Sequence, residues 1–112
     1  MRTQDVQIFE GSVNANGDSF DNPINVKNAS EVVLFLDVTE ANGATPGLIV
    51  YLMTKDEISG KWFLIGNFDT KESMGTDHTY IINGLGSSIA CKWAVTGVDP
   101  QFTFALNASI KD

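Results

Sequence analysis

The chain has 112 residues, and 14 Asp and Glu against 7 Lys and Arg give it a net charge of −7. One cysteine and one histidine exclude a disulfide within the chain, a cysteine-cluster zinc site and a histidine-rich metal site. An acidic surface repels phosphate groups, and no long apolar run is present. We therefore expect neither nucleic acid nor a membrane as a partner.

The first 30 residues differ in composition from the rest of the chain. They begin without the apolar segment of a signal peptide, which favours synthesis in a reducing cytoplasm. Apolar residues suggest a strand within residues 3–9, and residues 23–26 suggest a short edge strand, where proline is tolerated. We expect residues 1–30 to form an N-terminal arm that can contribute edge strands.

From residue 31 onward, apolar residues recur at every second position, which is the period of a β-strand. Between residues 31 and 39 both alternating faces carry apolar side chains, which is typical of a central strand. Further strands are expected at residues 47–54, 61–68, 78–83, 88–96 and 101–110. Turn-forming residues separate them at 41–47, 55–60, 83–86 and 97–100.

This spacing of strands, with no helical periodicity between them, predicts a single all-β domain. We expect an antiparallel β-sandwich of about six to eight strands, either jelly-roll or immunoglobulin-like. Residues 31–112 are expected to form the sandwich core.

The chemistry-bearing residues form no catalytic or metal-binding motif. The loop at 14–21 lacks the glycine and glutamate positions of an EF-hand, so a structural turn is expected. Alternation with Trp93 places Cys91 in the core, where a thiol is unreactive, and His78 starts a strand. The paired carboxylates at 56–57 lie in a hairpin loop. We expect no enzyme activity, no catalytic residue, no cofactor and no metal.

The aromatic residues offer one candidate binding surface. Tyr51 and Phe63 flank the loop at 55–60, and strand pairing could bring them together. Two exposed rings on one face would form a platform for a carbohydrate. The competing interpretation is that the two rings complete a second buried face or a subunit interface.

Beyond residue 31, the order of the turn and core motifs resembles a family of small tailed-bacteriophage virion proteins of about this length. The motifs are Leu34–Thr39, Gly43–Leu48, Lys55-Asp56 before Gly60–Trp62, Gly66–Phe68, Lys92–Gly97 and Pro100–Phe104. The chain departs from that family at Lys55-Asp56-Glu57-Ile58, which replaces the usual Ser-x-Asp-Gly, so contacts made by that loop do not carry over.

The resemblance implies a non-enzymatic structural protein, made in the host cytoplasm and built into the virion. A capsid decoration or cement subunit that stabilises the phage head is the form it favours. The major capsid protein or another virion protein would be the partner, and a homo-oligomer, a trimer above others, would match a three-fold axis of the shell. Partner contacts would come from the arm, through Arg2, Val6, Ile8 and Phe9, or from loop tips. The alternative is a carbohydrate-binding or adhesion module, either free or associated with a tail or fibre.

Overall fold

The computed structural model describes residues 3–82 and 85–112, and their secondary structure is entirely strands and turns. The strands are β1 (Thr3–Val13), β2 (Gly17–Asp18), β3 (Ile24–Asn25), β4 (Glu31–Lys55), β5 (Trp62–Asn67), β6 (Gly75–Ile81) and β7 (Ser88–Lys111). Every strand pair is antiparallel. The structure therefore confirms the predicted all-β antiparallel class.

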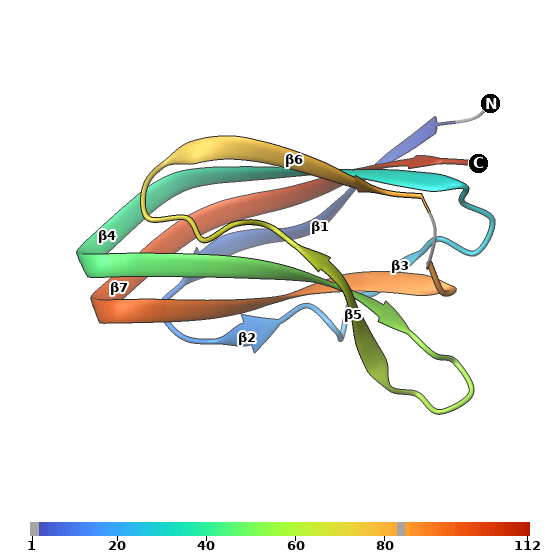
Figure 1. Ribbon diagram of the computed structural model, residues 1–112, viewed down its shortest axis with the longest axis horizontal. Helices are drawn as coiled ribbons and strands as arrows, with labels where there is room; N and C mark the ends of the chain where they lie inside the picture. Colours follow the sequence, from blue (N-terminus) through green and yellow to red (C-terminus); the bar gives the residue numbers. More distant parts are fainter. Residues whose placement is uncertain (1–2, 83–84) are drawn as a thin grey trace.

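Two long strands organise the fold. β4 and β7 run antiparallel along their whole length, from Glu31 opposite Lys111 to Thr54 opposite Ile89. Figure 1 shows that both strands fold over at the same end of the molecule, so the two-stranded ribbon doubles back on itself. The first half of β4 and the second half of β7 lie in one sheet, and the remaining halves lie in the other.

Each half of the ribbon gains strands at its sides. We call β1, the second half of β7, the first half of β4 and β6 sheet I. Sheet II contains β5, the second half of β4 and the first half of β7, with β2 and β3 following one another along its edge. This pairing and chain order are those of a jelly roll. Of the two expected sandwich types, the structure has the jelly roll.

The expected turns at 41–47 and 97–100 are corners within continuous strands, at which β4 and β7 each fold over from one sheet into the other. They lie opposite each other, where the β4–β7 register shifts, and each pair of expected strands merges into one long strand. Positive φ angles occur at both corners, at Gly43, Thr45, Gly97 and Asp99. A Cβ on Gly43 would lie 2.9 Å from the carbonyl oxygen of Asp99. The corners therefore require close approach of the two backbones.

The remaining elements lie close to their expected positions. The loop between β4 and β5 is a hairpin, since the Asp56 amide donates to the Lys61 carbonyl at 2.9 Å. β6 begins three residues before the expected strand at 78–83, and the last residue of that expected strand lies outside the described residues. The predicted edge strands at the start of the chain are present as β1 and β3.

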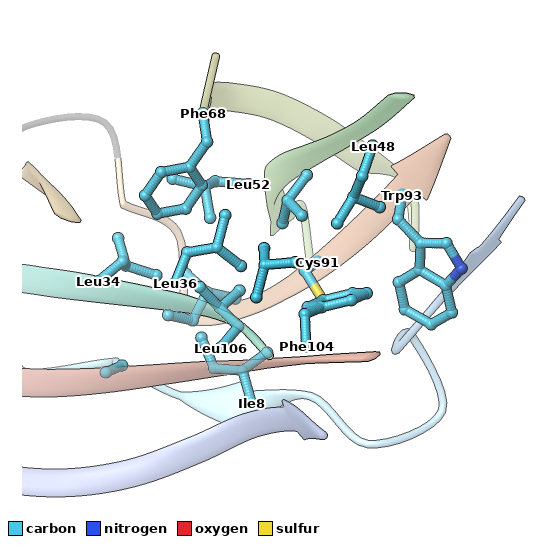
Figure 2. Packing of buried hydrophobic residues seen from close by; sticks show 14 of the residues in the cluster. Ile8, Leu34, Leu36, Leu48, Leu52, Phe68, Cys91, Trp93, Phe104 and Leu106 are labelled. Atoms are coloured by element: carbon cyan, nitrogen blue, oxygen red, sulfur yellow. The ribbon is translucent and has the colours of Figure 1, made fainter. Parts of the chain in front are cut away.

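The space between the two sheets holds one hydrophobic core. Away from the corners, even-numbered residues of β4 and of the second half of β7 point inward, as do odd-numbered residues of the first half of β7. Figure 2 shows Leu34, Leu36 and Leu106 from sheet I facing Leu48 and Leu52 from sheet II. Because both sheets contribute to one cluster, each sheet has only one face left for function.

Candidate functional site

The outer face of sheet I carries most of the acidic side chains found in strands. The outward positions of its strands include Asp5, Glu10, Glu31, Asp37 and Glu40, together with Lys111. The Lys111 ammonium group lies 3.3 Å from the Glu31 carboxylate and forms an ion pair with it. We call this surface the acidic face.

An apolar centre lies on the acidic face. Phe35 is 46% exposed and Tyr80 is 60% exposed, and both point outward from neighbouring strands. Beside Phe35 is a shallow hollow of about 380 Å³, which Asp5, Gln7 and Asn107 help to line. Exposed apolar groups with a polar rim are typical of a protein–protein contact surface.

The outer face of sheet II is covered by its own aromatic side chains. Phe20, from the β2–β3 connection, stacks on Trp62 of β5 with ring centroids 4.7 Å apart and planes inclined by 6°. Met53 and Ala90 occupy outward positions, opposite one another in the β4–β7 ladder. They are nevertheless only 7% and 1% exposed, and neither belongs to the central core cluster. We infer that the stacked pair covers them.

Two lysines on this second surface, which we call the aromatic face, each lie beside an aromatic ring. The Lys92 ammonium lies 5.3 Å from the centre of the Tyr51 ring, and the Lys55 ammonium lies 6.0 Å from the Trp62 ring. Leu64 points outward next to Met53 and is 57% exposed. Asp18 lies opposite Lys92 in the ladder. At the strand positions of this face, two lysines therefore accompany one carboxylate.

The structure does not bring Tyr51 and Phe63 together. Phe63 lies opposite Thr54 in the β4–β5 ladder, whereas Tyr51 lies opposite Asn67. Residues 51 and 54 of one strand differ by an odd number of positions, so their side chains point to opposite faces of the sheet. The expected platform of these two residues is therefore not formed, although each ring is accessible in part.

The sequence reasoning missed the Phe20–Trp62 pair. Trp62 was expected in a strand, but Phe20 lies in the polar segment that precedes β3, where no periodicity indicates a facing direction. Only the strand pairing of β2 with β7 brings Phe20 to sheet II. No local sequence signal connects two residues separated by this length of chain.

The arm residues expected to contact a partner are used by the fold itself. β1 pairs with β7 from Thr3 to Val13, and a β-bulge between Gln7 and Phe9 turns Ile8 and Phe9 inward together. Ile8 is buried, Val6 packs against the core, and the Phe9 ring lies 4.4 Å from the Trp93 ring. Their side chains therefore serve the packing of the sandwich, with Val6 and Phe9 partly accessible, and Arg2 lies outside the described residues.

Cys91 is buried at the centre of the sandwich, as predicted. Its amide donates to the Ser19 hydroxyl oxygen at 3.0 Å, and its thiol lies 3.5 Å from the same oxygen. Burial raises the pKa of the Cys91 thiol to about 11, because the thiolate loses its hydration. The thiol is therefore neutral at physiological pH and acts as a core residue.

The polar loops singled out in the sequence are engaged in local hydrogen bonds. Asn16 accepts from the Val95 amide at 2.8 Å, and Asp18 accepts from the Phe20 amide at 3.1 Å. Asp56 accepts from the Ser59 hydroxyl and the Ile58 amide, which lowers the pKa of its carboxyl group. These contacts hold the turns in shape.

His78 lies exposed on the acidic face, opposite Phe35. Its backbone amide donates to the Asp77 carboxylate at 2.8 Å. Within residues 3–82 and 85–112, no three histidine, cysteine or acidic side chains lie close enough to hold a metal ion. No helix in that same part of the chain is long and apolar enough to cross a membrane.

An open cavity of about 660 Å³ lies at the end of the sandwich near the two termini. Its lining includes Thr3 from β1, Ile24 from β3, Lys27 and Ile110. It lies between β1, at the edge of sheet I, and β3, at the edge of sheet II.

Neither a known protein family nor a curated protein matches this chain.

Proposed function

We propose that the protein is a non-enzymatic structural protein of a phage virion, and specifically a decoration or cement subunit on the head. The observation that carries this proposal is a jelly-roll sandwich whose acidic face exposes Phe35 and Tyr80 beside a hollow. Jelly rolls occur among viral capsid and lectin domains, and this part of the argument is an analogy of fold. The motif order noted in the sequence supports the same proposal.

The mechanism would be passive binding. A rigid sandwich would contact the major capsid protein, or another virion protein, and bridge neighbouring shell subunits. Each contact can be modest, because many symmetric copies act on one lattice and binding favours the assembled state. Synthesis in the host cytoplasm would precede incorporation, and a trimer would match a three-fold axis of the shell.

Mass spectrometry of purified particles of the phage that encodes the chain tests this proposal. We expect the protein in many copies per particle, and recombinant protein should rebind particles that lack it. A Phe35→Ser variant should rebind more weakly, whereas Ile58→Ser, at the fully exposed tip of the β4–β5 hairpin, should rebind like the parent. Absence from particles would overturn the proposal.

The second candidate is a carbohydrate-binding or adhesion module, and the aromatic face favours it. Tyr51 and the Phe20–Trp62 pair lie on one outer surface with Lys92 and Asp18, which supply both aromatic and polar contacts for a sugar.

A glycan array followed by tryptophan fluorescence titration tests the second candidate. Trp62→Ala should abolish binding of any sugar found, and Phe63→Ala, on the opposite side of the same strand, should not. An array without binders at high protein concentration would exclude this candidate.

A further inference from the structure

The acidic face and the aromatic face differ in charge. The acidic face has five carboxylates and one lysine at its outward positions, and that lysine is already paired with Glu31. At its strand positions the aromatic face has Lys55 and Lys92 against Asp18. The protein as a whole is strongly acidic, so this relative excess of cations on one face is a local feature.

Apolar groups lie at the centre of both faces. On the acidic face Phe35 and Tyr80 project beside the hollow that Asp5 helps to line. On the aromatic face Leu64 projects next to Trp62 and Lys55. Each face thus offers exposed apolar area with charges around it, and the excess charge at strand positions is negative on the acidic face and positive on the aromatic face.

We infer that copies of this chain associate head to tail, with the acidic face of one copy against the aromatic face of the next. Contact between two acidic faces would oppose carboxylates at short distance, whereas contact between unlike faces brings lysines to carboxylates. The inference deepens the proposed function and rests on it for the setting in which copies meet. The contact itself uses only residues of this chain.

A head-to-tail contact has definite consequences for assembly. Because the two contacting surfaces differ, each end of an open assembly keeps one unused face. Such an assembly either closes into a ring or continues to grow as a filament. A standard interface takes about 800 Å² from each partner, roughly one eighth of the 6377 Å² surface of one copy.

Sedimentation velocity over a range of protein and salt concentrations is the first test. We expect species larger than the monomer to increase with protein concentration. Raising salt from about 50 mM to about 500 mM should weaken association by about tenfold, because exposed charges are screened. A protein that stays monomeric at every concentration would overturn the inference, as would association strengthened by salt.

A mixing experiment distinguishes head-to-tail contact from a two-fold contact. Phe35→Lys changes only the acidic face, and Leu64→Glu changes only the aromatic face, both at exposed positions. Each variant alone should remain monomeric. Their equimolar mixture should form a dimer and stop there, because one intact face of each kind remains. Association of the parent without dimer formation in the mixture would place the contact elsewhere and overturn the inference.

Two controls keep the outcome interpretable. Ile58→Ser replaces an exposed apolar side chain that lies on neither face, so this variant should associate like the parent. If circular dichroism shows that Phe35→Lys is unfolded, Asp37→Lys replaces it, since this residue is exposed on the same face. Because the solution measurement involves no particle, this inference can fail while the virion proposal stands, and the reverse also holds.

Discussion

The two outer faces of the sandwich follow the same alternation of side chains and yet differ in what they expose. On the acidic face Phe35 and Tyr80 remain about half accessible. On the aromatic face the outward residues Met53 and Ala90 are buried. The difference shows that the polarity of strand positions does not by itself decide which face of a sheet is covered.

Side-chain size and the edge connections account for this difference. Ala90 is small, which leaves room above β7 for Phe20 and Trp62 to meet. The corresponding neighbours of Phe35 are Asn107 and His78, and the described residues supply no aromatic side chain that stacks on Phe35. A connection of the chain itself therefore covers part of the aromatic face, whereas Phe35 stays uncovered on the acidic face.

The largest expected effect comes from the core that both faces share. Leu106→Ala should lower the free energy of unfolding by about 3 kcal/mol, because the cavity lies between the sheets and cannot close. Chemical denaturation followed by both tryptophan fluorescence and far-ultraviolet circular dichroism should give coincident transitions. Asn107→Ala, exposed on the same strand, is the control and should change stability by less than about 0.5 kcal/mol. Separate transitions would mean that the two sheets unfold independently.

The second largest effect on stability is expected at the corners of β4 and β7, which set the two sheets opposite each other. Gly43→Ala should cost about 2 kcal/mol, because its φ is +114° and the new Cβ would lie 2.9 Å from the Asp99 carbonyl oxygen. Gly60→Ala also has a positive φ, but no atom lies within 4 Å of its new Cβ. It should cost about 1 kcal/mol, measured by the same denaturation. Equal costs would show that backbone contact at the corner is unimportant.

Removing the Phe20–Trp62 pair that covers the aromatic face should have a smaller effect on the free energy of unfolding. Trp62→Ala should cost about 1.5 kcal/mol by exposing Met53, whereas Tyr80→Ala on the acidic face should cost less than about 0.5 kcal/mol. A double-mutant cycle with Phe20→Ala should give a coupling of about 1 kcal/mol. No measurable coupling would contradict the inference that the two rings act together as a cover.

The smallest effect concerns an ion pair that links the two sheets. Lys71 exchanges backbone hydrogen bonds with Leu48 of sheet II, and its ammonium group contacts Asp77 of sheet I. Hydrogen bonding from Lys71, followed by that from the His78 amide, lowers the pKa of the Asp77 carboxyl group below its ordinary 3.8. The pair therefore stabilises the fold above about pH 4, and this stabilisation is lost as pH falls through the lowered pKa.

Thermal unfolding at pH 7 and pH 3 measures that contribution. Asp77→Asn should lower stability at pH 7 by no more than about 1 kcal/mol and should reduce the loss on acidification. Lys71→Gln should have a similar effect, and the two substitutions together should cost little more than either alone. An unchanged acid dependence in Asp77→Asn would show that other carboxylates account for it.

Much of the fold was predictable from the alternation of apolar residues. The central strand at 31–39, the inward position of Cys91 and the hairpin at 55–60 all depend on local patterns, and the structure confirms them. The turns at 41–47 and 97–100 were expected to separate strands, but glycine and proline mark a corner within a continuous strand as readily as a loop between two strands. Only the partner strand distinguishes the two.

The candidate surfaces were less predictable. Tyr51 and Phe63 were paired on their spacing, but the β-bulge and register of β4 and β5 place them on opposite faces. Ile8 and Phe9 were assigned to an arm, but the bulge in β1 turns both of them inward. A bulge shifts the alternation of inward and outward side chains by one residue, and the neighbouring side chains do not indicate where a bulge occurs.

The sequence by itself determined the all-β class, the alternation of inward and outward positions, and the net charge. These properties follow from backbone geometry and residue type, which are local. The tertiary structure alone decided that the β4–β7 ribbon doubles over, that Phe20 reaches Trp62, and that the carboxylates gather on one outer face. Those outcomes depend on pairing between distant segments, which register and corner geometry select and which local alternation does not encode.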